Sequence, residues 1–221
     1  MSGAGDAAYD HAFAFWRLLA EMSVAFGRSK ALVNTSAPIV LSNTLWYPEP
    51  ESIAEMGDFY KEQGVLPSCF LSSRLDDNLF GALALTNAGY SRTAQYGFSP
   101  LTATPPSGSS VEQVSWAQAW ALGEVIAAAH NVGPYAVVVG QTLALALQLE
   151  PTLAAFVAYD GKPIGAMVTL ETSQLVAFVL ETLSAEADTA LRARLSFEAE
   201  TRGKEASVFE QTVTGTLELW G

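Results

Sequence analysis

Two glutamates at the ends of strand-like runs are the residues of this sequence best suited to acid–base chemistry. Glu171 ends one apolar run and Glu181 ends the next. A carboxylate takes a proton from an amine when partial burial raises its pKa. We therefore treat both as candidate catalytic bases, and the alternative for each is a solvated glutamate with no chemical role.

Other reactive side chains are sparse. The two histidines, His11 and His130, are far apart in the sequence, and the single cysteine, Cys69, lies in the apolar run Cys69-Phe-Leu. One cysteine excludes an internal disulfide, and this set does not provide the ligands of a zinc site, so we expect no metal. The glycine motifs of nucleotide-binding loops and the serine-hydrolase elbow are also absent. We expect structural roles for both histidines and a core position for the cysteine.

The second half of the chain contains the clearest local signals. Asp160-Gly161 stands between two apolar runs, 153–159 and 163–170, which predicts a β-hairpin. Ser184 is a suitable N-cap for a helix that runs to about Arg202 and stops at Gly203. The other predicted elements of this half are strands at 111–114, 175–181, 206–211 and 212–220 and helices at 116–130 and 135–149.

The first half predicts alternating helices and strands after a long first helix. Paired prolines and small polar residues in 102–110 indicate a linker, so we expect one part at 1–106 and another at 107–221. The predicted elements of the first part are helices at 6–26, 51–63 and 76–87 and strands at 38–41, 68–72 and 90–98.

The order of elements in 107–221 resembles that of the GNAT superfamily of acyl-CoA N-acyltransferases. The stretch Ala155-Phe-Val-Ala-Tyr-Asp-Gly-Lys-Pro-Ile-Gly-Ala-Met-Val168 is similar to the hairpin of that family. The part at 1–106, which includes Asn87-Ala-Gly-Tyr90, resembles the partial GNAT repeat found in two-part members. The resemblance implies an α/β (α+β) fold in which helices flank a mixed central sheet, built as a partial repeat plus a full module.

The resemblance also implies where a cofactor would bind. The strand at 175–181 matches the family's central strand, whose backbone holds the pantetheine arm of acetyl-CoA, which points to Phe178, Val179 and Leu180. Ser184 would begin the cofactor helix. Either Glu171 or Glu181 would act as the general base.

The sequence departs from the family at two functional positions. Family members bind the cofactor pyrophosphate with a glycine-rich loop before the helix, but residues 171–202 contain no glycine, and Glu186 and Asp188 lie where the anion would go. Many members use a tyrosine near the C-terminus as the acid, whereas the last tyrosine here is Tyr159. We therefore expect acetyl-CoA to bind weakly or not at all.

Composition narrows the classes of partner. The chain has 221 residues and a net charge of −12, which opposes binding to nucleic acid and to an anionic membrane. Residues 125–149 carry no charge, but both flanks are acidic, so we expect buried helices there and no membrane span. Asp6 and Asp10 precede the first base, Arg17, which is unlike a secretion signal, so we expect a cytoplasmic protein.

Three functions remain open. The first is a GNAT-fold protein that has lost acyl transfer and acts as a dimeric binding or regulatory protein. The second is an active N-acetyltransferase with an atypical cofactor loop, and the third is an unrelated α/β enzyme. With 50% hydrophobic and 15% charged residues, we also expect a homodimer, and we expect it to pair through a C-terminal strand at 212–220.

Overall fold

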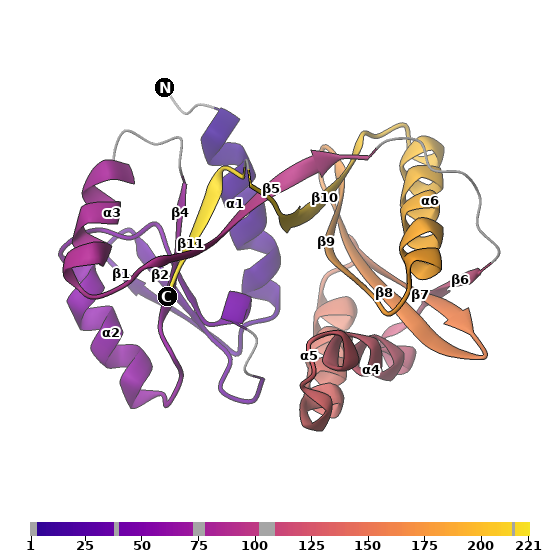
Figure 1. Cartoon of the computed structure of the whole chain (residues 1–221), viewed down its shortest axis with the longest axis horizontal. Helices are drawn as coiled ribbons and strands as arrows, with labels where there is room; N and C mark the ends of the chain where they lie inside the picture. Colours follow the sequence, from indigo (N-terminus) through magenta and orange to yellow (C-terminus); the bar gives the residue numbers. More distant parts are fainter. Residues whose placement is uncertain (1–3, 38–39, 73–77, 102–108, 214) are drawn as a thin grey trace. The chain divides into compact units, whose positions relative to one another are not determined.

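Short apolar segments form strands and longer segments form helices in two compact units of the chain (Figure 1). This computed structural model describes residues 4–37, 40–72, 78–101, 109–213 and 215–221. The first unit comprises residues 1–97 and 210–221, and the second comprises residues 98–209. The C-terminal segment thus belongs with the first unit, which differs from the division at 106/107 expected from the linker.

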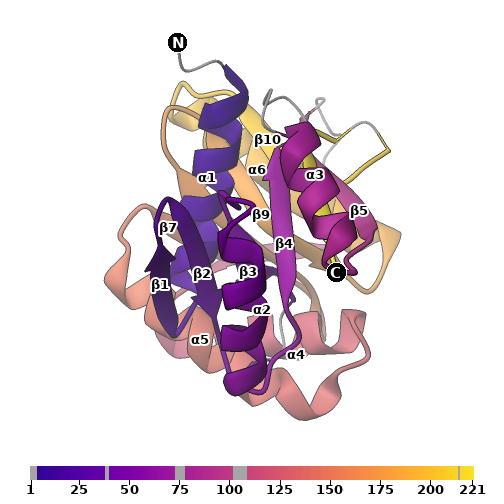
Figure 2. The same cartoon turned by 90° about the vertical axis from the view of Figure 1, so that its left-hand side faces the viewer.

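The strands of the first unit follow the order β1-β2-β3-β4-β11-β5. Neighbouring residues of β4 face opposite sides of this sheet. Phe70 lies on the side of α1, and Tyr9 Oη donates a hydrogen bond to the backbone carbonyl of Phe70 at 2.6 Å. Cys69 lies on the other side and packs with residues of α2 and α3. Figure 2 shows α2 in front of these strands and α1 behind them. The elements are α1 (Ala4–Leu18), β1 (Met22–Phe26), β2 (Ser29–Val33), a 3-10 turn (Val40–Ser42), β3 (Thr44–Trp46), α2 (Ser52–Glu62), β4 (Ser68–Ser72), α3 (Asn78–Asn87), β5 (Arg92–Pro100) and β11 (Leu217–Trp220).

The strands of the second unit follow the order β10-β9-β8-β7-β6. All neighbours are antiparallel except β9 and β10, which are parallel. A row of buried apolar residues on α6 packs on β7, β8 and β9. Helix α4 packs on β8 and β9 and also against α5. The elements are β6 (Ser110–Val114), 3-10 turns (Trp116–Gln118, Gly133–Tyr135), α4 (Trp120–Ala129), α5 (Ala136–Leu149), β7 (Leu153–Asp160), β8 (Lys162–Glu171), β9 (Leu175–Thr182), α6 (Ala185–Thr201) and β10 (Ala206–Gln211).

The predicted hairpin and the capped helix are confirmed. Strands β7 and β8 pair from Leu153↔Leu170 to Asp160↔Lys162, and Gly161 has the positive φ of +68° that this turn requires. Ser184 caps α6, because its Oγ accepts a hydrogen bond from the amide of Ala187 at 3.2 Å. Within the described segments, no helix has both the length and the apolar character needed to cross a membrane.

The long first helix predicted at 6–26 is wrong beyond Leu18. Residues 22–26 form β1 and pair with β2 through a turn at Gly27, whose φ is +61°. Pairing with β2, which is almost entirely buried, overrides the helical spacing of the apolar residues in this segment. The predicted strand at 38–41 is also misplaced: residues 38 and 39 lie outside the described residues, Val40–Ser42 is a 3-10 turn, and the strand is Thr44–Trp46.

The C-terminal strand is shorter than predicted and is not a free sheet edge. Only Leu217–Trp220 is extended, and this strand pairs with β4 on one side and with β5 on the other. The backbone groups that pair two chains at a sheet edge are therefore already used within the first unit. The exposed sheet edge expected at 212–220 is therefore wrong for Leu217–Trp220, and the homodimer stays a prediction.

Candidate functional site

The pairing between β9 and β10 stops halfway along β9. The parallel ladder consists of Leu175↔Ala206, Val176↔Ser207 and Ala177↔Val208, although β9 continues to Thr182. Among the described residues of the second unit, the strand beyond Ala177 has β8 as its only strand partner. One backbone edge of Phe178–Thr182 is therefore available to a ligand in this unit.

A β-bulge lies where the ladder stops. Val179 pairs with Val168 and Ala177 pairs with Thr169, so Phe178 has no opposite residue on β8. A bulge increases the local twist and redirects backbone groups, and bulges are frequent beside active sites. The bulge and the end of the β10 ladder coincide at one residue, which identifies this stretch as the candidate site.

Three phenylalanines pack together at the bulge. The ring of Phe178 lies 5.8 Å from that of Phe98 and 5.5 Å from that of Phe209, and the last two are 5.3 Å apart. Phe178 and Phe209 are buried, and Phe98 is half-buried. Of the other predicted cofactor residues, Val179 is buried and Leu180 packs against the α6 core. The side chains of this stretch thus support the fold, and its backbone is what a ligand would contact.

The start of α6 is a tight, capped connection with an acidic residue in its first turn. The amide of Leu183 donates to the carbonyl of Ile164 at 2.8 Å, so strand pairing continues to the residue before the Ser184 cap. The cap occupies the amide of Ala187, and Glu186 is exposed in the first turn. A glycine-rich loop would offer several free amides to an anion here, whereas this connection is tight and carries a carboxylate.

The second acidic residue of that turn is partly neutralised. Asp188 accepts hydrogen bonds from Arg192 Nε at 2.9 and 3.1 Å, one turn further along the helix. Its charge is therefore compensated within α6, and Glu186 is the main source of negative potential at the helix start. The sequence showed both acids but not this ion pair.

The two candidate bases lie at opposite ends of the antiparallel pair β8–β9. Glu171 is opposite Leu175, whereas Glu181 is opposite Ala166. Glu171 contacts Arg202 at 2.5 Å and Lys204 at 2.9 Å. The Lys204 ammonium, followed by the Arg202 guanidinium, hydrogen-bonds to Glu171 and lowers the pKa of that carboxyl, which makes it a poor base.

Glu181 lies within the candidate site and has a partner that the sequence did not reveal. His130 Nε2 is 3.1 Å from Glu181 Oε1, and the side chains are 57% and 33% exposed. His130 ends α4, which packs on β9. Because the packing of α4 on β9 creates this pair across 51 positions, no local signal in the sequence predicts it.

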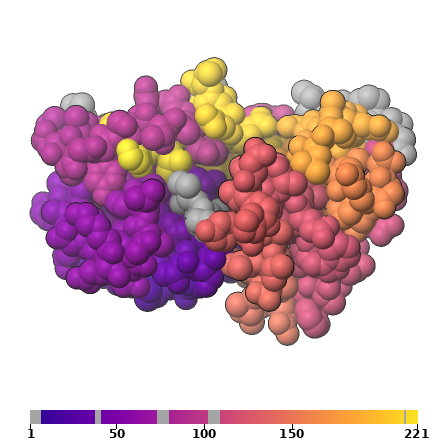
Figure 3. All heavy atoms as spheres, turned by 60° about the horizontal axis from the view of Figure 1, so that its bottom comes forward, coloured from indigo at the N-terminus to yellow at the C-terminus, as the bar shows by residue number. Residues whose placement is uncertain are grey.

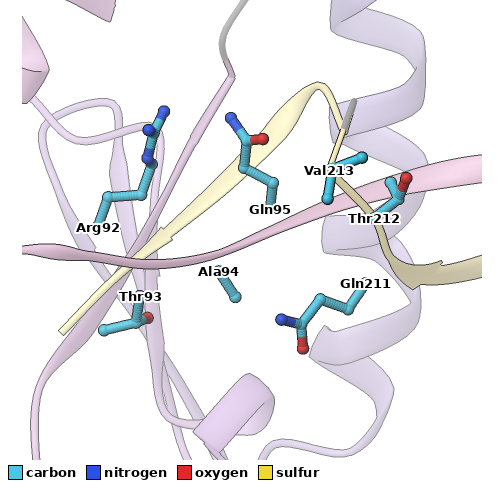
Figure 4. Close-up of a pocket in the computed structure, with 7 residues that line it drawn as sticks. All are labelled: Arg92, Thr93, Ala94, Gln95, Gln211, Thr212 and Val213. Atoms are coloured by element: carbon cyan, nitrogen blue, oxygen red, sulfur yellow. The ribbon is translucent and has the colours of Figure 1, made fainter.

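The first unit contains an open groove of about 420 Å³ that the sequence did not suggest (Figure 4). Arg92 and Gln95 extend to the same side of β5 within it, and Gln211 at the end of β10 and Thr212 directly after it also line the groove. Arg92 Nη1 is 3.0 Å from the buried carboxylate of Glu218. Because this pair has no net charge, the groove does not select for an anion.

Comparison with known proteins identifies the fold. A search of protein-family models finds no match, and a search of curated proteins finds no similar sequence. Among solved structures, a GCN5-related N-acetyltransferase from Kribbella flavida is 14% identical with a TM-score of 0.64, covering 97% of this chain and 95% of that one. A conserved protein of unknown function from Staphylococcus epidermidis is 14% identical with a TM-score of 0.59, covering 89% and 91%.

A third structure, of a protein from Novosphingobium aromaticivorans assigned to the GNAT family, is 11% identical with a TM-score of 0.51, covering 94% of this chain and 95% of that one. At these identities the similarity concerns the fold alone. The chain has the GNAT fold over nearly its whole length, as the hairpin and the order of elements predicted.

Proposed function

We propose that this protein has lost acetyl-CoA-dependent acyl transfer and acts through binding on the GNAT fold. The observation that carries the proposal is the start of α6, where Ser184 caps a tight connection and Glu186 is exposed. The nucleotide end of acetyl-CoA carries several negative charges. Two unit charges about 4 Å apart repel each other by roughly 4 kcal/mol at an effective dielectric constant of 20. Solvent reduces this figure at an exposed site, but its sign opposes binding.

The acid–base groups support the same proposal. Glu171 is held by two cations that lower its pKa, so it has little tendency to accept a proton at neutral pH. No tyrosine follows Tyr159 in the sequence, and this removes the acid that many family members use. On this proposal the site has no phosphate-binding loop and no tyrosine acid, and it keeps the backbone edge of Phe178–Thr182 and the pair His130–Glu181.

A comparison of two ligands tests the proposal. Acetyl-CoA and S-acetylpantetheine share the thioester arm, but only acetyl-CoA carries the nucleotide phosphates. We expect calorimetry to show that acetyl-CoA binds with no higher affinity than S-acetylpantetheine. Glu186→Arg should increase acetyl-CoA affinity at least several-fold, whereas the matched change Glu200→Arg, at an exposed position near the other end of α6, should not. An affinity for acetyl-CoA at least tenfold above that for S-acetylpantetheine would contradict the proposal.

The pair His130–Glu181 favours a second candidate, an active acyltransferase with an atypical cofactor loop. The carboxylate lies on β9 beyond the end of the β10 ladder, and a histidine–carboxylate pair can accept a proton from an amine. Release of free thiol from acetyl-CoA in the presence of a panel of amines tests this candidate. Turnover that Glu181→Gln and His130→Ala both abolish would establish it over the first proposal.

A further inference from the structure

Two tryptophans at the start of α4 face solvent. Trp116, in the 3-10 turn that leads into α4, is 54% exposed, and Trp120, the first residue of α4, is 55% exposed. Of the other tryptophans in the chain, Trp16 and Trp46 are buried and Trp220 is partly buried. Because tryptophan is highly buried on average and is frequent in binding sites, two exposed copies at one helix indicate a binding surface.

Helical spacing places a carboxylate in line with the two rings. Trp116, Trp120 and Glu124 follow one another at intervals of four residues, about one helical turn, so neighbouring Cβ atoms lie about 5–6 Å apart. Glu124 is exposed, and in the part of the chain that the structure describes it forms no ion pair. We call these three residues the α4 row. Figure 3 shows the surface over residues 116–149 in rose to salmon tones toward the viewer.

The chain supplies no cation of its own to the α4 row. Residues 93–161 contain no Lys or Arg, but they contain the acids Glu112, Glu124, Glu150 and Asp160. Among the described residues, no cation lies over the ring of Trp116 or Trp120. The whole chain carries a net charge of −12, which attracts cationic molecules from solution. A cation over these rings would therefore come from a partner.

Helix α6 shows which group such a set of side chains binds. The Cζ atom of Arg194 lies 5.0 Å from the ring centroid of Phe156 and 5.8 Å from that of Phe197. Arg194 Nη2 is also 2.6 Å from Glu198 Oε1. Two aromatic rings and one carboxylate thus hold a guanidinium group in the second unit. The α4 row presents the same combination with indole rings, which attract cations more strongly than phenyl rings do.

Close packing of α4 on α5 fixes the backbone of the α4 row. A Cβ atom on Gly140 would lie 3.2 Å from the Cα of Trp120, and one on Gly123 would lie 2.7 Å from the amide nitrogen of Gly140. Only glycine allows the two backbones to approach this closely. The backbone of Trp120 is therefore already ordered before a partner binds, which lowers the entropy that binding costs.

We propose that the α4 row binds an arginine side chain in a basic peptide segment of a partner protein. The planar guanidinium stacks on an indole ring and donates hydrogen bonds to the carboxylate of Glu124. A lysine ammonium lacks the plane that stacks, so arginine uses both kinds of group in the row. This inference goes beyond the proposed function and is independent of it, because no residue of the α4 row lies at the end of the β10 ladder.

Fluorescence anisotropy with a labelled octa-arginine peptide and the full chain tests the proposal. Salt at about 150 mM screens the long-range attraction of the acidic surface. Octa-lysine has the same charge without the planar group, and octa-citrulline has a planar group without the charge. We expect octa-arginine to bind several-fold more tightly than octa-lysine and much more tightly than octa-citrulline. Equal affinities for octa-arginine and either comparison peptide, or no binding of octa-arginine, would overturn the proposal.

Substitutions locate the binding site. Trp120→Ala and Glu124→Gln should each weaken octa-arginine binding about fivefold, the equivalent of about 1 kcal/mol. Glu200→Gln removes the same charge from an exposed position of α6, and Leu66→Ala shortens a side chain that is 89% exposed in the first unit. Both control changes should alter the affinity less than about twofold. Losses in the controls that equal those in the α4 row would assign the peptide to the acidic surface in general and reject the site.

Indole signals in heteronuclear NMR spectra of the wild-type chain give an independent readout. Octa-arginine should shift the Nε1–H signals of Trp116 and Trp120 and leave those of the buried Trp16 and Trp46 unchanged. Trp116→Phe and Trp120→Phe, which keep an aromatic ring, assign the two exposed signals. Unshifted signals of Trp116 and Trp120, or equal shifts of all the tryptophans, would contradict binding at the α4 row.

Discussion

His130 Nε2 lies 3.1 Å from Glu181 Oε1, and this contact joins the end of α4 to the part of β9 that β10 no longer accompanies. The pair therefore marks the side of the sheet on which a ligand at the bulge would meet ionisable groups. Both side chains are partly exposed, so the pair adds little to the stability of the second unit.

We expect His130→Ala to lower the free energy of unfolding by less than about 1 kcal/mol, the usual range for an exposed ion pair. Urea unfolding followed by circular dichroism measures this quantity. Lys61→Ala, which breaks the exposed pair Lys61–Asp58 at 3.2 Å in the first unit, provides a control of similar size. A loss above about 2 kcal/mol for His130→Ala alone would show that the pair is structural.

A buried carboxylate in α6 predicts a larger effect. Glu198 is buried and contacts Arg194 at 2.6 Å and Arg202 at 2.8 Å. Glu198→Ala removes the shared acceptor of two guanidinium groups, and we expect a loss of about 1–3 kcal/mol. Glu200→Ala, an exposed position in the same helix, should change the stability by less than about 0.5 kcal/mol. Equal effects of the two changes would show that the buried network contributes nothing.

The pH dependence of stability reports on Glu171. Hydrogen bonds from Lys204 and Arg202 lower the pKa of this carboxyl from its ordinary value of 4.5. A carboxyl whose pKa is lower in the folded state stabilises the protein above its unfolded pKa and loses that contribution as the pH falls through the folded value. The stability of the wild type should therefore decrease below about pH 4.5, and Glu171→Gln should make this decrease shallower. Urea titrations between about pH 3 and pH 6 measure the slope. An unchanged slope in the variant would contradict this assignment.

The packing of α4 on α5 depends on Gly123. A Cβ atom at this position would overlap the carbonyl oxygen of Ala136 and lie 2.7 Å from the amide nitrogen of Gly140. Since both neighbours are backbone atoms, Gly123→Ala must separate the helices, and we expect a loss of about 1–3 kcal/mol in a thermal or urea melt. Gly133→Ala is the matched control, because a Cβ there meets nothing within 4 Å. A neutral Gly123→Ala would mean that the helices pack less closely than described.

The sequence predicted correctly the elements whose formation depends on residues close together in the chain. The helix at 52–62, the strand at 68–72 and the Ser184 cap each follow from residues within a few positions of one another. Long-range pairing decided the elements that the sequence misassigned. Residues 22–26 extend because β2 pairs with them, and Leu217–Trp220 enters the middle of a sheet because β4 and β5 flank it.

In the candidate site, too, features that depend on neighbouring residues could be predicted, and features that depend on long-range contacts could not. The stretch Phe178–Leu180 and the missing glycines before α6 were visible in the sequence, because a family resemblance maps onto consecutive residues. The sequence did not reveal three other features of the site: the end of the β10 ladder, the bulge at Phe178 and the contact between His130 and Glu181. Each of these depends on the register or packing of segments that lie far apart in the chain.

The affinity of the wild-type chain for acetyl-CoA tests the central claim most directly. The tight, capped connection at Ser184 and the exposed Glu186 predict that isothermal titration calorimetry detects no binding tighter than roughly 100 μM, about −5.5 kcal/mol. A dissociation constant near 10 μM or tighter, about −7 kcal/mol, would contradict the account and establish that this GNAT fold retains its cofactor site.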